Sequence, residues 1–600
     1  MSRSLMQNED QRNIVIAVIL SAVILFGWTF AQEYFFPPSP EQIAAREAAQ
    51  QQAQTQASAG SDGSIPDLPG GTDNLLSLIE GAPRDEVLAN GTRITIDTPT
   101  VQGSISLVGG RVDDLVLKNY QETIEEDSDN VVLLSPAGTK DPYYADFGWI
   151  SNDRNLSLPN HKTVWETTST NLTPDSPVTL TWNNGQGLSF ERTLKIDDGY
   201  MINVTQNVVN SSGNAVDLAP YSRVSRIGTP ETLGYYILHE GPIGVLGGSL
   251  TEVDYSDLQD DKEIKIPTTG GWIGITDKYW LTALIPDQSK SANTRFYYSG
   301  KNGPDRYQTD YFYDAEIIGS GQTAEFTSNF FAGAKEVPLI DAYNEKLGIQ
   351  DLDLAVDFGW FYYITKPFFY ALHWMTGIVG NVGLSILAVT VVIKLFLFPL
   401  ANKSYVSMAK MRKLQPKIVQ LKEKFGEDRQ KLNQEMMTLY KQEKVNPMAG
   451  CLPIIVQIPI FFSLYKVLFV TLEMRQAPFY GWINDLSVPD PTSLVNGFGL
   501  LPWGIPEADT LIAFLNIGIW PVLMGISMFL QQQLNPQPAD PIQAKVFLFM
   551  PLFFTFLLGT FPAGLVIYWT WNNLLSLIQQ AVIMKKAGVS LGRQPTASNT

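Results

Sequence analysis

Apolar stretches long enough to cross a lipid bilayer are unevenly placed along this chain of 600 residues. A transmembrane helix needs about 20 predominantly apolar residues. One candidate lies near the N-terminus and five lie in the C-terminal part: 14–31, then 380–401, 450–472, 511–530, 546–561 and 564–583. The sequence therefore predicts a polytopic α-helical membrane protein with six spans.

The N-terminal candidate, 14–31, is preceded by a short polar segment, 1–13. Its uninterrupted apolar run of 18 residues exceeds the core of an ordinary signal peptide and favours a retained signal anchor. A cleaved signal also fits, because Thr29-Phe30-Ala31 resembles a cleavage site. The following segment, 32–84, is predicted to be a flexible linker, since it is rich in Pro, Ala, Gln, Ser and Gly without apolar periodicity.

A large all-β domain is predicted over residues 85–336. Short alternating segments such as Arg93–Ile96 are separated by Gly, Pro and Asn clusters, which is the pattern of strands in a sandwich. Asn184-Gly185 lies between two such segments, Val178–Trp182 and Leu188–Leu194, and supplies the positive φ angles that a tight hairpin turn needs. Because no interruption is longer than a loop, one β domain accounts for the whole segment.

Residues 337–379 are predicted to hold a linker and an amphipathic helix on the membrane surface. The segment Asp357–Val379 is rich in Trp, Tyr and Phe, with Lys366 and His373 among them. Aromatic rings with polar tips favour the headgroup zone of a bilayer. A buried core helix is the alternative for the same pattern.

The charges of the loops predict the orientation of the spans. Segment 402–449 is strongly basic, the tail 584–600 also carries lysines, and 473–510 holds a single basic residue, Arg475. Lys and Arg collect on the cytoplasmic side. We therefore expect both termini and the segments 402–449 and 531–545 to lie in the cytoplasm. The β domain and the segment 473–510 are expected in the periplasm.

The basic segment 402–449 also shows helical periodicity. Apolar residues recur at three- and four-residue spacing from Met411 to Phe425 and again from Leu432 to Leu439, with a turn at Gly426 between them. This pattern predicts two antiparallel helices. A charged face is often merely solvated, but it also suits a docking arm for the ribosome or an emerging chain, for which the candidate contacts are Lys410, Arg412, Lys413, Lys417, Lys422 and Lys424.

The most informative single residue is Lys394, which has apolar neighbours on both sides. A lysine at the centre of a span costs about 2.5–3.5 kcal/mol on insertion scales, so it requires water or a polar partner. Snorkelling towards the cytoplasm is one solution. The other is a wet cavity, for which the spans offer further polar side chains: Thr390, Gln457, Asn572 and Asn573. Ordinary hydrogen bonding between helices is the competing interpretation of these residues.

Several classes of protein are disfavoured. The net charge of −18 argues against a sequence-specific nucleic-acid binder, Cys451 stands alone and excludes an internal disulfide framework, and three scattered histidines cannot form a His-rich metal site. No phosphate-binding loop occurs, so no cofactor is expected. A secondary transporter would need an internal repeat or a carboxylate relay within the spans, and neither is found.

One short pattern resembles catalytic chemistry. Ser463-Leu464-Tyr465-Lys466 matches Ser-x-x-Lys, whose spacing places a hydroxyl and an amine on one helical face. The pattern is common by chance and no accompanying hydrolase motif is present. We therefore expect no catalytic residues, with a Ser/Lys hydrolase as the alternative.

Longer motifs resemble the YidC family of bacterial membrane protein insertases. The similar segments, all between 357 and 583, include Leu414-Gln415-Pro416-Lys417-Ile418, Gly450-Cys451-Leu452-Pro453, Gln457-Ile458-Pro459, Leu472-Glu473-Met474-Arg475-Gln476-Ala477-Pro478 and Phe561-Pro562-Ala563-Gly564-Leu565. Their length and order make chance agreement improbable. The β domain resembles that of the family in size and position rather than in motif.

The resemblance implies five core helices around a hydrophilic groove, a periplasmic β-supersandwich, and a location in the bacterial inner membrane. It implies a non-enzymatic insertase and chaperone acting on nascent membrane proteins, alone or with the Sec translocon. The expected partners are therefore these clients, the Sec translocon and the lipid bilayer, together with the ribosome suggested by the basic segment. In the family a positive residue, commonly Arg, lies in the groove, and Lys394 occupies the matching position. A lysine keeps the positive charge but lacks the planar guanidinium group that can bind a carboxylate through two hydrogen bonds. By the same matching, Thr390, Gln457 and Asn572 line the groove.

Overall fold

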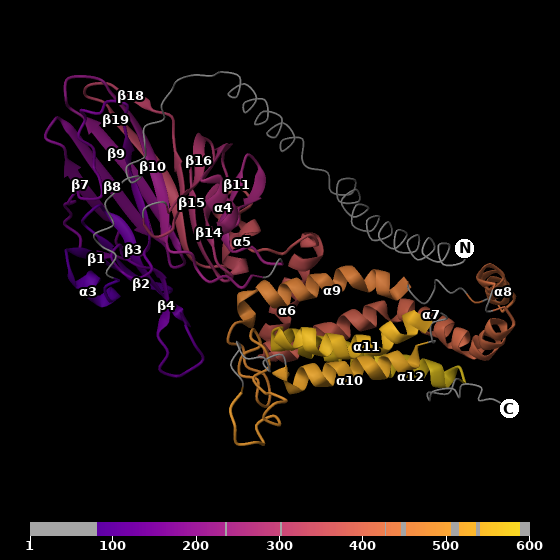
Figure 1. Ribbon diagram of the computed structural model, residues 1–600. Helices are drawn as coiled ribbons and strands as arrows, with labels where there is room; N and C mark the ends of the chain where they lie inside the picture. The colour runs from indigo at the N-terminus through magenta and orange to yellow at the C-terminus, as the bar shows by residue number, and fades with distance from the viewer. Residues whose placement is uncertain are drawn as a thin grey trace.

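The computed structural model describes residues 81–234, 237–300, 303–425, 428–443, 445, 452–505, 515–535 and 541–588. The predicted anchor 14–31, nearly all of the predicted linker, Cys451 and the last twelve residues of the tail lie outside this description. The described chain forms a β part followed by a bundle of long helices (Figure 1).

The β-rich prediction is confirmed, and the strands form two sheets. The larger has eleven strands, in the order β13 (Glu263–Thr269), β16 (Ser291–Ser299), β17 (Arg306–Phe312), β10 (Val216–Ile227), β5 (Tyr143–Ile150), β3 (Arg111–Gln121), β2 (Val101–Ser106), β1 (Arg93–Asp97) and β6 (Asn171–Leu172), with β18 (Glu316–Ile318) beside β10 and β4 (Asn130–Leu134) beside β3. The smaller has eight: β12 (Ser249–Glu252), β11 (Gly241–Leu246), β14 (Trp272–Thr276), β15 (Trp280–Ile285), β19 (Thr323–Ala334), β9 (Met201–Asn210), β8 (Leu188–Ile196) and β7 (Val178–Asn183).

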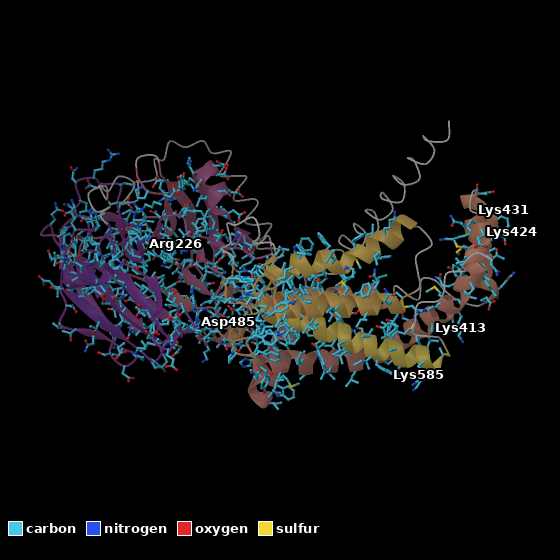
Figure 2. All side chains as sticks on the ribbon, turned by 60° about the horizontal axis from the view of Figure 1, so that its bottom comes forward. Arg226, Lys413, Lys424, Lys431, Asp485 and Lys585 are labelled. Atoms are coloured by element: carbon cyan, nitrogen blue, oxygen red, sulfur yellow. The ribbon has the colours of Figure 1, made fainter. Side chains whose placement is uncertain are left out.

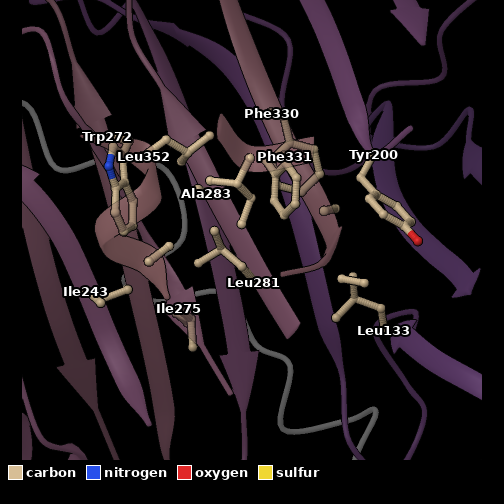
Figure 3. Packing of buried hydrophobic residues seen from close by; sticks show 14 of the residues in the cluster. Leu133, Tyr200, Ile243, Trp272, Ile275, Leu281, Ala283, Phe330, Phe331 and Leu352 are labelled. Atoms are coloured by element: carbon tan, nitrogen blue, oxygen red, sulfur yellow. The ribbon is translucent and has the colours of Figure 1, made fainter. Parts of the chain in front are cut away.

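Alternating side chains explain why these segments form strands. Along β8, every second residue from Leu188 to Leu194 is buried, including Arg192, while Ser189, Glu191 and Thr193 between them are more exposed. Figure 3 shows how Trp272, Leu281, Phe330 and Phe331 of the smaller sheet pack in this core, each completely buried. Burying such a side chain contributes roughly 1.5–3 kcal/mol.

The predicted hairpin of β7 and β8 is confirmed, with Val178 opposite Leu194 and Trp182 opposite Phe190. Its turn differs from the expected one. The positive φ angles belong to Gly185 and Gly187, at 71° and 89°, rather than to Asn184. Asn184 instead closes a four-residue loop by accepting hydrogen bonds from the backbone N–H groups of Gln186 and Leu188.

Short helices complete the β part and lead to the bundle: α3 (Arg84–Ala89), α4 (Tyr255–Asp261), α5 (Val337–Leu347) and the 3₁₀ segment η2 (Leu352–Ala355). The bundle consists of α6 (Tyr362–Val379), α7 (Val382–Phe425), α8 (Arg429–Gln442), α9 (Leu452–Val470), α10 (Ile519–Leu534), α11 (Pro541–Leu557) and α12 (Ala563–Lys586), with 3₁₀ turns η4 (Leu472–Met474) and η6 (Leu558–Thr560).

Helices α7 and α9–α12 lie alongside one another (Figure 1). Helix α12 packs against α10, α7 and α9, and α6 packs against α7 and α9. Within the described residues, one helix, α7, contains an apolar stretch long enough to span a membrane by length and composition, and Ile455–Val470 and Lys545–Thr560 are shorter apolar helices. The predicted number of six spans therefore stays a prediction.

Helix α7 continues without a break from the apolar stretch into the basic segment. Helix α8 then packs back against α7. Met436 and Leu439 of α8 contact a buried cluster formed by Leu414 and Ile418 of α7 and by Val445, which follows α8. Figure 2 shows Lys413, Lys424, Lys431 and Lys585 together at the end of the molecule far from the β part, whereas Asp485 lies at the opposite end of the bundle. The two ends of the helices thus differ strongly in charge.

Candidate functional site

Lys394 lies on α7 and points towards α12. Its ammonium group donates a hydrogen bond to Ser576 Oγ at 2.8 Å, and the Ser576 hydroxyl in turn donates to the carbonyl oxygen of Asn572 at 2.8 Å. Lys394 is half-buried and Ser576 is almost fully buried. Among the ion pairs found within the described residues, none involves Lys394. Its charge is therefore solvated by a neutral hydroxyl.

A second contact extends this arrangement to a third helix. Gln457 on α9 donates its amide N–H to Asn572 Oδ1 on α12 at 3.2 Å. Lys394, Ser576, Asn572 and Gln457 consequently form one polar cluster that joins α7, α12 and α9. None of the four is a carboxylate, so the polar cluster carries a net positive charge.

Two of the predicted residues stay outside the polar cluster. Thr390 is buried and its hydroxyl donates to the carbonyl oxygen of Ile386 at 2.6 Å, one turn earlier in the same helix. Asn573 donates instead to Ser527 Oγ on α10 at 3.2 Å. Successive helical residues point about 100° apart, which explains why Asn572 and Asn573 face different neighbours.

Sequence reasoning missed Ser576. Its signal is spacing: Ser576 lies four residues after Asn572, so both occupy one face of α12. A serine within an apolar helix carries little information alone, since its hydroxyl is readily satisfied by its own backbone. Its role emerges only when Lys394 is known to face it.

The Ser-x-x-Lys pattern does not form a catalytic pair. Ser463 is completely buried and its hydroxyl has no hydrogen-bond partner. Lys466 forms an ion pair with Asp357 Oδ2 at 2.6 Å and donates to the carbonyl oxygen of Ile237 in the β part. A Ser/Lys hydrolase requires a hydrogen bond between the two side chains, and that bond is missing here.

The basic residues of α7 fall into distinct environments. Lys410, Lys413, Lys417 and Lys424 are exposed, and Lys417 pairs with Glu443 of the chain after α8 at 2.6 Å. Lys422 is half-buried. Arg412 is buried and lies against the C-terminal end of α10, where it donates to the carbonyl oxygen of Leu534 at 3.4 Å. A cation there favours the negative end of the helix dipole, so Arg412 holds α7 against α10.

The β part contains a separate polar cavity. It is lined by charged side chains, among them Arg111, Asp146, Arg192 and Arg223, and its volume of about 10 Å³ suffices for roughly one water molecule. Burial tends to raise the pKa of the Asp146 carboxyl, but Arg223 and Arg111 outweigh that effect and hold the pKa below its ordinary value. This cavity is too small to receive a segment of another protein.

Among the residues that the structure describes, no three His, Cys, Asp or Glu side chains gather in a group able to hold a metal ion. The polar cluster is chemically suited to binding rather than to bond breaking. It offers one cation, two amides and a hydroxyl, arranged across three helices.

Comparison with known proteins identifies close relatives. A family described as the YidC periplasmic domain matches residues 93–371, and one described as 60Kd inner membrane protein matches residues 374–589. The membrane protein insertase YidC of Beijerinckia indica subsp. indica is 49% identical over 597 residues, and that of Rhizobium meliloti is 48% identical over 588 residues; 97% of each chain is covered in both cases. A crystal structure described as an active YidC insertase with the first transmembrane domain resolved covers 82% of this chain and 92% of its own, with 17% identity and a TM-score of 0.33.

Proposed function

The chain belongs to the YidC family of membrane protein insertases, and we propose that its polar cluster is where a polar segment of a client protein enters the bilayer. The protein is a membrane protein insertase of the inner membrane with a β-rich periplasmic domain. The cluster of Lys394, Ser576, Asn572 and Gln457 would form the polar wall of a groove between α7, α9 and α12.

The observation that carries this proposal is the state of Lys394. A charge in an apolar helix is costly and is retained where it has a task. Lys394 has a hydroxyl for a partner instead of a carboxylate, so its charge is available to an acidic group of a client. Water in the groove would shorten the apolar distance that the client's polar tail must cross, which lowers the barrier to its passage.

The proposed topology has six spans, with the anchor 14–31 followed by α7 and α9–α12. The concentration of lysines at the end of the bundle far from the β part supports a cytoplasmic position for that end. With six spans, both termini would then lie in the cytoplasm. The β domain would then lie in the periplasm. Helix α6, whose Trp374 and Ile378 are exposed while Phe369 and Leu372 are buried, would lie at the membrane surface.

The helical hairpin of α7 and α8 is the proposed contact for the ribosome and for emerging clients. Its exposed cations, Lys410, Lys413, Lys417 and Lys424, support this role, while Arg412 serves the fold instead. Insertion would proceed alone or beside the Sec translocon. The reaction would need neither a nucleotide nor a covalent intermediate, because the membrane potential contributes about 2.3 kcal/mol for each charge moved across 100 mV.

The test is insertion of a short client with one span into liposomes that contain only this protein. Two versions of the client are compared, one with an acidic tail and one in which the acidic residues are amidated by Asp→Asn and Glu→Gln changes. We expect Lys394→Ala to slow insertion of the acidic client severalfold, and Lys394→Arg to preserve it because the charge remains. Protection of the tail from protease measures insertion.

Matched controls separate the charge from general damage. Lys403→Ala removes an exposed cation from the same helix, and Ser463→Ala removes the hydroxyl of the Ser-x-x-Lys pattern. Both are expected to insert the client normally. If Lys394→Ala slows insertion of the acidic and the amidated client equally, the lysine does not act by electrostatic attraction. If Ser463→Ala abolishes insertion, the result would instead favour a Ser/Lys hydrolase.

A further inference from the structure

The loop between α9 and α10 exposes apolar side chains, whereas a loop that faces water usually exposes polar and charged ones. Residues 491–505 contain no Asp, Glu, Lys or Arg. Leu500 is 89% exposed and Trp503 is 53% exposed. Their neighbours Leu494, Leu501 and Ile505 are also exposed. Exposed apolar side chains in this number on one turn indicate a surface that is covered by something other than water.

Two carboxylates of the same connection, Asp485 and Asp490, are held by hydrogen bonds within it. Asp490 is almost completely buried and accepts hydrogen bonds from Trp482 Nε1 at 3.0 Å and from the backbone N–H of Trp520 at 2.9 Å, in the first turn of α10. Asp485 accepts from the backbone N–H groups of Gln476 and Ser487. These two carboxylates therefore hold the connection together, and the turn 491–505 carries no charged side chain.

The backbone of this turn satisfies its own hydrogen bonds. The N–H of Phe498 donates to the carbonyl oxygen of Ser493 at 2.7 Å, and that of Leu501 donates to the carbonyl oxygen of Asn496 at 2.9 Å. Trp503 Nε1 closes the turn by donating to the carbonyl oxygen of Val495 at 3.0 Å. Unpaired backbone groups are not tolerated in lipid, so a turn with this degree of internal pairing is compatible with immersion.

The loop also lies at the end of the bundle that the proposal requires. Figure 1 shows it at the ends of α9 and α10 nearest to the β part, where it extends sideways from the bundle instead of along the helix axes. Exposed apolar side chains continue from it along α10 and α11, where Leu523, Ile526, Phe549 and Phe553 are exposed. Tryptophan favours the headgroup zone, where its ring is buried and its N–H remains bonded.

We propose that residues 494–505 are immersed in the headgroup region of the bilayer leaflet on the side of the β domain, as a lipid-binding wedge. The wedge fixes the depth of the α9–α10 connection relative to the membrane surface. This inference rests on membership of a membrane protein family and is independent of the polar cluster.

The test places a fluorescent label at single cysteines in the full chain. Cys451→Ser gives a background without cysteine, since Cys451 is the one cysteine of the sequence. Leu500→Cys probes the wedge. Ile317→Cys on β18, 78% exposed and remote from the bundle, reports water, and Phe549→Cys on α11, 63% exposed, reports lipid. Each variant carries an environment-sensitive dye in phosphatidylcholine and phosphatidylglycerol vesicles, and is quenched either by iodide or by lipid with a nitroxide near its headgroup.

We expect the headgroup nitroxide to quench the label at position 500 at least as strongly as the label at position 549, which lies in the middle of α11. The iodide quenching constant at position 500 should be severalfold lower than at position 317. Quenching by iodide to the same extent as at position 317 would place the loop in water and overturn the inference. Protection from both quenchers would overturn it as well, because the loop would then be covered by protein. Insertion activity does not enter either measurement.

Discussion

Lys466 is expected to hold the β domain on the helical bundle. Its ammonium group pairs with Asp357 at 2.6 Å and donates to the carbonyl oxygen of Ile237, and the two charged side chains are only 14% and 22% exposed. Removing one partner of a fully buried pair costs about 3–5 kcal/mol. Because this pair is partly exposed, we expect Lys466→Met to cost about 2 kcal/mol, which corresponds to a fall of roughly 4–8 °C in the unfolding midpoint of a domain of this size.

A double-mutant cycle measures this coupling. Lys466→Met, Asp357→Asn and the double variant are compared with the unmodified chain by thermal unfolding in detergent, with Lys346→Met as a control at an exposed lysine. The double variant should lose clearly less than the two single losses combined, because no charge remains without a partner. Additive losses would refute the reasoning. The same variants test whether domain docking influences insertion, since α9 carries Lys466 near one end and Gln457 nearer the other.

Three further predictions concern the β domain and use the same thermal assay. Burial lowers the pKa of Lys335 to about 8 from an ordinary value of 10.5. Between these pH values the unfolded chain binds more protons than the folded chain, so the free energy of unfolding should rise as the pH increases from 8 towards 10. Lys335→Met should reduce this rise. Asp146→Asn removes the buried carboxylate charge that lies 2.6 Å from Arg223 and should cost about 3 kcal/mol or more, whereas an unchanged midpoint would contradict the pairing. Gly274→Ala would bring a Cβ atom within 1.9 Å of a backbone oxygen of β15 and should disrupt the smaller sheet, while Gly377→Ala meets nothing within 4 Å and should be tolerated.

The sequence predicts the elements better than their contacts. Strand alternation located β7 and β8 and their antiparallel pairing, because burial on one face leaves a period of two in the sequence. The turn was less predictable: Asn184 was expected at positive φ, yet it acts through its side chain, and glycines take the strained positions. Turn geometry depends on loop length, which a dipeptide does not specify.

The polar cluster was predicted in part for a similar reason. A lysine among apolar residues is visible in any sequence, and Gln457 and Asn572 follow from the same search for polar residues within spans. Whether Asn572 or Asn573 faces Lys394 depends on the rotation of α12, which is set by packing against α7 and α10. Arg412 was grouped with its exposed neighbours because local charge does not reveal that α10 ends beside it.

The pairing of Lys394 with a hydroxyl suits a site that must bind and then release. A carboxylate partner within the fold would compete with an acidic client residue on equal terms. Ser576 offers the ammonium group a neutral acceptor, whereas a client carboxylate would add the attraction between two opposite charges. A client carboxylate in the proposed groove would therefore displace Ser576. When the client moves on, the ammonium group returns to the hydroxyl without remaining unsolvated, so neither the bound nor the empty state leaves a charge without a partner.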